Sequence, residues 1–239
     1  MTSEPKSFAE EYGLPTGLKW WIIFFPLVVF ASFAVAMSVD AIQDYAFALV
    51  KESNVVDWLT SGPALAGGIL GIILAMREQR RGKEKLIWIF YLFFAIGLIF
   101  IAGEETSWGQ DFFHYRTPGF FERHNEQGDF TFHNLDGMNA RNHYLRLGFG
   151  AGGLIGLLLW KSERFRDVAP PRALQIWFWL IAVKSVLDIH YIFSAGETMP
   201  SYIISELSEV IEMLIAMAGF LYVWLNGRRL ARLPNVSSS

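Results

Sequence analysis

Six apolar segments dominate this chain, and each is close to the length of about 20 residues that an α-helix needs to cross a bilayer. Hydrocarbon offers no partner to backbone N–H and C=O groups, so a segment of this length crosses it as a helix, which satisfies those groups internally. We therefore predict an all-α fold, a polytopic membrane bundle of about six transmembrane helices that forms one integral-membrane domain over residues 1–239. The predicted spans are Trp20–Met37, Ser61–Met76, Leu86–Gly103, Leu145–Trp160, Leu174–Phe193 and Tyr202–Leu225.

Composition excludes several functional classes. The chain is 53% hydrophobic and 16% aromatic, which is more apolar than a soluble domain of this length. A formal net charge of −3 provides no basic face for nucleic acid, so we expect no nucleic-acid partner. The absence of cysteine from the sequence excludes disulfides, thiolate metal ligands, iron–sulfur clusters and a cysteine nucleophile.

The distribution of lysine and arginine predicts the orientation. Basic residues cluster in the loops after the second and fourth spans and near the C-terminal end, and such clusters face the cytoplasm. Six spans then place both termini in the cytoplasm and a structured polar loop, residues 104–143, on the outer face. We expect a multi-pass protein of the bacterial inner (cell) membrane in contact with membrane lipids.

The fifth and sixth spans carry ionisable side chains, which are costly in hydrocarbon and usually face a bundle interior or each other. Lys184 and Asp188 are four residues apart, so they share a helix face and can form a purely structural ion pair. Glu206, Glu209 and Glu212 cannot all ionise at low dielectric without compensation. A metal ion, a basic side chain from another helix or a shared proton would each provide it.

The outer loop collects four of the five histidines, which are His114, His124, His133 and His143. At a rise of about 1.5 Å per residue, Glu104, His190 and Glu209 reach a similar depth, roughly 24–27 Å above the inner face. If the third span continued outward as a helix, Glu104, Trp108 and Asp111 would also share one face. These placements predict one polar site near the outer surface.

Three short sequence motifs in and beside this loop resemble those of a known family: GEETSWGQ (103–110), NEQGDF (125–130) and HN (133–134). They resemble the signature of a group of bacterial multi-pass membrane proteins in which a Glu-Glu-x-Ser-Trp-Gly-Gln block precedes Asn-x-Gln-x-Glu/Asp and His-Asn. The resemblance covers this loop and the layout of the spans, and it implies no activity. The residues that match are Glu104, Glu105, Trp108, Gln110, Asn125, Gln127, His133 and Asn134.

The chain is more loosely similar to the membrane-embedded metal hydrolases of the ceramidase and adiponectin-receptor type, which hold zinc within one leaflet. Those proteins have seven spans and a pair of histidines on one helix. This chain has six predicted spans and no such pair, so the likeness supplies a mechanistic analogy alone.

Histidines and carboxylates at one depth favour a divalent metal such as zinc, iron or manganese, although neither HExxH nor a Glu-x-x-His within a span occurs. The predicted metal ligands are Glu105, His133, His190 and Glu209. The predicted catalytic residues are Glu104, Glu105, His133, Asn134 and Glu209. The residues predicted to support them are Asp188, Glu212, Trp108, Gln110 and Lys184.

Three functions are compatible with these features. The first is a metal-dependent hydrolase or transferase that acts on a lipid or lipid-linked substrate beneath the outer loop. The second is a non-catalytic structural or accessory subunit of a larger membrane complex or of a homo-oligomer. The third is a proton-coupled transporter, which is weakened because the sequence shows no internal repeat.

Overall fold

The computed structural model describes residues 7–51, 55–125, 128–136, 141–194 and 199–233, and within these ranges it contains helices and no strand. The prediction of an all-α fold is therefore confirmed. The longer helices are α2 (Thr16–Ser38), α4 (Val55–Arg80), α5 (Lys85–Glu104), α8 (Asn142–Gly156), α9 (Gln175–Ser194) and α10 (Met199–Ala231). The short elements are α1 (Phe8–Tyr12), α3 (Gln43–Val50), η1 (Ser107–Gly109), α6 (Gln110–Phe113), α7 (Gly119–His124), η3 (Leu157–Lys161), η4 (Arg166–Val168) and η5 (Arg172–Leu174).

Five helical stretches in the described ranges are long and apolar enough to cross a membrane, and they coincide with five of the six predicted spans. The exception is the fourth predicted span, Leu145–Trp160. There α8 keeps α-helical geometry to Gly156 and then tightens into the 3-10 turn η3. A Cβ atom on Gly156 would lie 3.0 Å from Cγ of Pro170, and the Trp160 indole donates to the Pro170 carbonyl at 2.7 Å. The end of this segment is thus packed tightly against the loop before α9.

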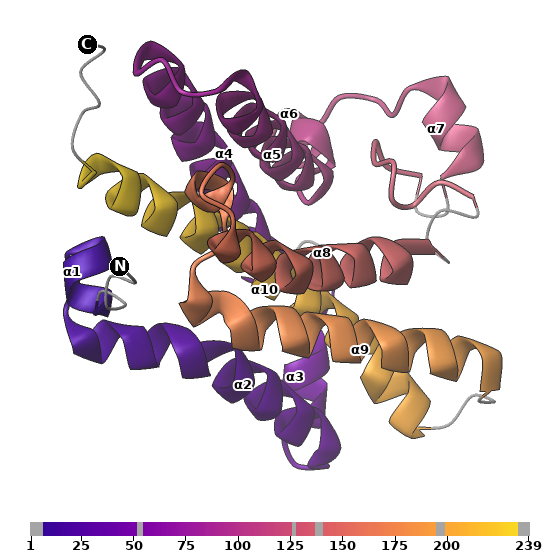
Figure 1. The fold of residues 1–239 in the computed structure, drawn as a ribbon. Coiled ribbons are helices and arrows are strands. Elements are labelled where there is room, and N and C mark those ends of the chain that lie inside the picture. The colour runs from indigo at the N-terminus through magenta and orange to yellow at the C-terminus, as the bar shows by residue number, and fades with distance from the viewer. Residues whose placement is uncertain (1–6, 52–54, 126–127, 137–140, 195–198, 234–239) are drawn as a thin grey trace, which may run out of the picture.

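The long helices form two pairs around a central helix (Figure 1). Helix α4 packs along α5, and α8 packs along α9, while α10 contacts α4 most extensively and also touches α2 and α9. Of the five candidate spans, α10 has the most buried apolar window, at 67%, which places it at the centre of the bundle. Glu212 of α10 is paired with Arg146 of α8, as expected for an ionisable group in a membrane segment.

Glycines let helices approach closely, both within the two pairs and between α4 and α10. A Cβ atom on Gly71 of α4 would lie 2.8 Å from Cβ of Ala95 on α5, and one on Gly67 would lie 3.0 Å from Cα of Phe220 on α10. In the second pair, a Cβ atom on Gly150 of α8 would lie 2.7 Å from the backbone nitrogen of Ala182. Small residues at helix crossings are a common packing device in membrane proteins, where backbones must approach to gain dispersion contacts.

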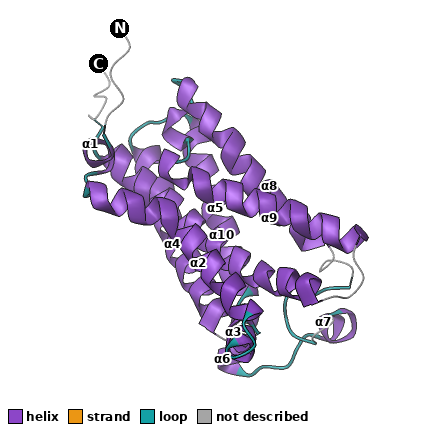
Figure 2. Cartoon of the chain, turned by 90° about the horizontal axis from the view of Figure 1, so that it is seen from below, coloured by secondary structure: helices purple, strands orange, loops and turns teal. Residues whose placement is uncertain are grey.

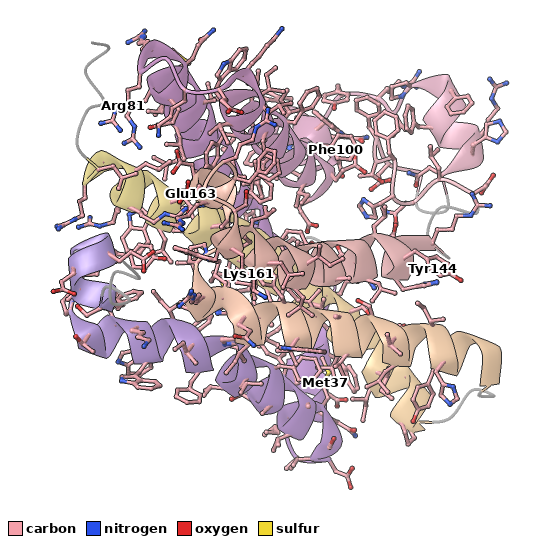
Figure 3. All side chains as sticks on the ribbon, viewed as in Figure 1. Met37, Arg81, Phe100, Tyr144, Lys161 and Glu163 are labelled. Carbon is pink, nitrogen blue, oxygen red and sulfur yellow. The ribbon has the colours of Figure 1, made fainter. Side chains whose placement is uncertain are left out.

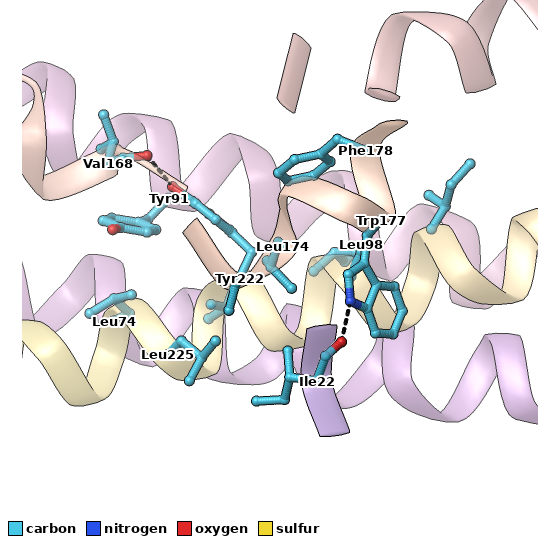
Figure 4. Packing of buried hydrophobic residues seen from close by; sticks show 14 of the residues in the cluster. Ile22, Leu74, Tyr91, Leu98, Val168, Leu174, Trp177, Phe178, Tyr222 and Leu225 are labelled. Atoms are coloured by element: carbon cyan, nitrogen blue, oxygen red, sulfur yellow. Dashed lines mark hydrogen bonds between the residues drawn. The ribbon is translucent and has the colours of Figure 1, made fainter. Parts of the chain in front are cut away.

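Aromatic side chains fill the core between the helices, and their polar ends reach backbone carbonyls (Figure 4). The Trp177 indole donates to the carbonyl of Ile22 at 2.7 Å, and the hydroxyl of Tyr222 donates to the carbonyl of Val168 at 2.8 Å. These bonds satisfy groups that would otherwise be buried without a partner. They also tie α9 to α2, and α10 to the loop before α9.

The two ends of the bundle differ in character. At one end α1 packs against α10, where Arg228 donates to the carbonyls of Tyr12 and Gly13 at 2.9 and 3.1 Å. At the opposite end lie α6 and α7, which belong to the polar loop (Figures 1 and 2). The loop and the last turns of the helices beside it form the region where the sequence predicts a site.

Candidate functional site

A cavity of about 300 Å³ is lined by α5, α8, α10 and the outer loop. Figure 3 labels Phe100 near the end of α5 and Tyr144 near the start of α8, the two helix ends that flank it. The apolar lining residues are Phe100, Ile101, Phe132, Leu145, Phe149 and Ile215. The polar lining residues are Glu104, Glu105, His133, Asn142, Arg146 and Glu212. Apolar walls with a few convergent polar groups are typical of ligand sites.

Glu104, the last residue of α5, is the anchor of the outer loop. Its side chain is buried, and both of its oxygens accept hydrogen bonds. Oε1 accepts from the Trp108 indole at 2.7 Å, and Oε2 accepts from the backbone N–H groups of Phe132 and His133 at 2.8 and 2.9 Å. The predicted catalytic residue Glu104 therefore joins the end of α5 to a segment 28 residues further along the chain.

His133 is held by the same carboxylate. Its Nδ1 lies 3.1 Å from Oε2 of Glu104, so Nδ1 carries the proton that the carboxylate accepts, and Nε2 takes no part in this bond. His133 also lines the cavity. Burial by itself would lower the pKa of His133. The hydrogen bond that His133 donates to Glu104 and the nearby charge of Glu212 outweigh burial and raise that pKa above its ordinary value.

Glu105 follows directly and lines the cavity beside Glu212. Burial raises the pKa of Glu105 well above its ordinary range, and the charges of Glu212 and Glu209 raise it further. These effects favour the protonated form of Glu105. A protonated carboxyl is one of the three forms of compensation that the sequence leaves open for its acids.

A basic side chain from another helix provides the second form. Arg146 of α8 donates to Glu212 of α10 through Nε at 2.9 Å and through Nη2, and its Nη1 lies 4.0 Å from Asp188 of α9. Lys184 contacts Asp188 at 2.5 Å, which confirms the predicted ion pair, and donates to Ser208 at 3.0 Å. This network joins α8, α9 and α10 behind the cavity.

Arg146 lines the cavity but is not among the site residues predicted from the sequence. It lies in the second position of a predicted span, and an ionisable side chain so placed is a signal for a buried partner. Its partner Glu212 is 66 residues away, which no helical periodicity could predict.

Several other residues predicted for the site do not line the cavity. His190 is exposed and stacks edge-on against Tyr191, and it does not line the cavity. Asn134 is buried and does not line the cavity. Glu209 does not line it either, but its charge helps to raise the pKa of Glu105. Gln110 accepts from the backbone N–H of Phe130 at 2.9 Å and so supports the loop. Gln127, which belongs to the family-like motif, lies outside the described residues.

The predicted metal ligands are brought together only in part. Glu105 and His133 line one cavity, whereas His190 does not. Among the residues that the structure describes, no group of three or more histidine, aspartate or glutamate side chains has a spacing that could hold a metal ion. A metal held by the predicted set stays a prediction.

The chain reverses sharply after Glu105, and this reversal creates the site. Ser107 and Trp108 have positive φ angles of 46° and 55°, and Gly109 follows at 91°. Non-glycine residues in this left-handed region are strained, and such strain gathers at functional segments. The helix therefore does not continue outward as expected. Instead the turn folds the Trp108 indole back onto Glu104.

Comparisons with protein family models, with curated proteins and with solved structures found no match to this chain.

Proposed function

We propose that this chain is a membrane-embedded hydrolase or transferase that acts on a lipid or lipid-linked substrate, with His133 as general base and Glu104 as the group that orients it. The observation that carries the proposal is the His133–Glu104 hydrogen bond at the wall of a largely apolar cavity. A carboxylate on one imidazole nitrogen fixes the tautomer and stabilises the imidazolium that forms during proton transfer.

The walls of the cavity support a lipid substrate. Phe100 of α5 and Leu145 of α8 line it, and both side chains are also exposed on the outside of the bundle, at 43% and 67%. In a bilayer these exposed faces contact acyl chains, so a substrate can enter sideways between the helix pairs. The polar groups gather at the end of the cavity nearest the loop, which suits an amphiphile with its head group there.

The chemistry needs one residue to move a proton. In hydrolysis, Nε2 of His133 accepts a proton from water as the water oxygen bonds to the carbonyl carbon or phosphorus of the substrate. The imidazolium, stabilised by Glu104, then gives the proton to the leaving oxygen as its bond to carbon or phosphorus breaks. In group transfer, a hydroxyl group of a second substrate takes the place of water. In the metal-assisted form predicted from the sequence, Glu105 and His133 would be ligands, so His133 would hold the metal in place of acting as the base. Metal analysis of the detergent-purified protein tests that form.

The proposal is tested by incubating the purified chain with a total bacterial lipid extract and identifying products by mass spectrometry. We expect His133→Asn, which keeps an N–H for Glu104 but has no imidazole, to reduce product formation by at least about 100-fold. His114→Asn changes an exposed histidine of the same loop and should leave it unaltered. Equal product from the wild type and His133→Asn would overturn the proposal. Stoichiometric purification with a large partner, without any turnover, would favour the accessory-subunit function.

We also propose that the chain crosses the bilayer six times with both termini in the cytoplasm. The segment α8–η3 would be the fourth crossing, because its helical rise of about 30 Å matches the thickness of the hydrocarbon core. The polar loop then lies at the outer face, and the cavity opens in the outer leaflet.

A further inference from the structure

The head-group end of the cavity has an excess of carboxyl groups. Three of them, Glu104, Glu105 and Glu212, line it, and the charge of Glu209 acts on Glu105. The lining contains two side chains that can carry positive charge, Arg146 and His133. Burial and the charges of Glu212 and Glu209 favour the protonated form of Glu105, so a negatively charged ligand is disfavoured there, whereas a bound cation would be stabilised and would take the place of that proton.

Both basic groups are already engaged with carboxylates. Arg146 is hydrogen-bonded to Glu212 and lies near Asp188, while His133 is hydrogen-bonded to Glu104. Among the described residues, Glu105 is the lining carboxyl that makes no ion pair with a basic side chain. The lining thus offers a carboxyl to a ligand and no uncommitted cation.

Aromatic rings complete this end of the cavity. Phe100, Phe132 and Phe149 line it, and the rings of Phe100 and Phe132 are 5.9 Å apart between centroids. The Trp108 ring lies 5.5 Å from that of Phe100. The faces of aromatic rings carry negative charge density, and rings around an acid are a known arrangement for alkylammonium groups.

We propose that the ligand of this cavity is an amphiphile whose head group carries a positive charge, an amine or a quaternary ammonium, held between Glu105 and the phenyl rings of Phe100 and Phe132. This inference rests on the proposed function in that it names the substrate class of the same site. The cavity is at the small end of ligand sites, so it fits one head group and the adjoining part of a chain. Leu145 and Ile215 provide the apolar surface for that chain.

Native mass spectrometry of the full chain in an uncharged maltoside detergent tests the proposal. The probes share one dodecyl chain and differ in head group: dodecyltrimethylammonium, dodecyl sulfate and dodecyl glucoside. We expect one saturable adduct with the ammonium, and at least tenfold weaker binding of the sulfate and the glucoside. Equal binding of the three, or a preference for the sulfate, would overturn the proposal.

Two variants locate the binding. Glu105→Gln should weaken ammonium binding about tenfold and leave glucoside binding unchanged, whereas Glu122→Gln removes the same charge from an exposed position on α7 and should change neither. Phe132→Leu keeps the apolar volume but removes a ring, so it should also reduce the preference for ammonium. This second variant decides the matter if Glu105→Gln does not fold. Full ammonium selectivity in both variants would contradict the assignment of the site.

The outcome is separable from that of the proposed function. Selective ammonium binding without any His133-dependent product would uphold the ligand class and overturn the enzyme. His133-dependent turnover of an anionic or neutral lipid, together with no ammonium selectivity, would support the proposed enzymatic function and overturn the proposed ligand class.

Discussion

At the scale of single residues, Glu104 does the most to organise the site, because one carboxylate accepts hydrogen bonds from two backbone N–H groups, an indole and an imidazole. Its charge is also a cause of the raised pKa of His133. For the proposed reaction, the raised pKa predicts the direction of the pH dependence. A general base works when neutral, so the proposed activity should be lost as the pH falls through the raised pKa of His133.

Glu104→Gln should therefore move the acidic limb of the pH–activity profile to lower pH. The amide oxygen can still accept from the backbone N–H groups of Phe132 and His133, but the negative charge that favours the imidazolium is gone. The variant also loses the acceptor of the Trp108 indole, so Trp108→Phe is the matched control and should leave the limb in place. NMR titration of labelled histidine in detergent gives the same pKa without a substrate. An unshifted limb in Glu104→Gln would show that this pair does not control the proton of His133.

Arg146 and Glu212 form a largely buried ion pair between α8 and α10. Arg146→Met should lower the free energy of unfolding by about 3 kcal/mol, because it leaves a buried carboxylate without its partner. The double variant Arg146→Met/Glu212→Gln should recover part of this loss, since no unpaired charge remains. Reversible unfolding in mixed detergent measures both, and strict additivity of the two substitutions would indicate that the pair is uncoupled.

At the scale of the elements, the close approach of α4 to its neighbours depends on glycines. Gly71→Ala places a methyl group 2.8 Å from Cβ of Ala95, which is closer than carbon atoms tolerate, so α4 and α5 must separate. We expect the free energy of unfolding to fall by about 1–3 kcal/mol. Gly97→Ala on α5 is the control, because a Cβ atom there meets nothing within 4 Å and alanine favours the helix. A thermal shift assay compares the stabilities of the two variants. Equal stability would contradict the close packing of α4 against α5 at Gly71.

At the scale of the whole molecule, the site exists because two helix pairs flank one central helix. The α4–α5 pair supplies Glu104 and Glu105 at the end of α5, the α8–α9 pair supplies Arg146 and the buried Asp188, and α10 supplies Glu212. The loop then folds over the cavity and adds His133. Neither pair alone would enclose the carboxyl groups or compensate their charge.

The proposed six-span topology is open to a direct test, because the chain contains no cysteine. Glu122→Cys on α7 and Gln79→Cys near the end of α4 each introduce a single exposed thiol at opposite ends of the bundle. A membrane-impermeant maleimide added to intact spheroplasts should label Glu122→Cys, and it should label Gln79→Cys only after the membrane is permeabilised. Labelling of both, or of Gln79→Cys alone, would refute the orientation.

The sequence by itself determined what depends on neighbouring residues. Apolar length identified five helices, because helix formation in hydrocarbon is a local requirement of the backbone. The spacing of Lys184 and Asp188 was enough to predict their ion pair, since residues four apart share a helix face. The grouping of acids and histidine around the loop was also visible as composition.

The tertiary structure alone decided which of these groups meet. A similar predicted depth put His190 level with Glu104, but depth does not specify the direction in which a helix face points, and His190 is exposed. The hydrogen bond between His133 and Glu104 forms beside a chain reversal at Ser107 and Trp108, which have left-handed backbone angles. The Arg146–Glu212 ion pair depends on how α8 lies against α10. Contacts between residues far apart in the chain depend on which helices pack together. The helical periodicity of 3.6 residues describes one helix and does not say which other helix will be its neighbour.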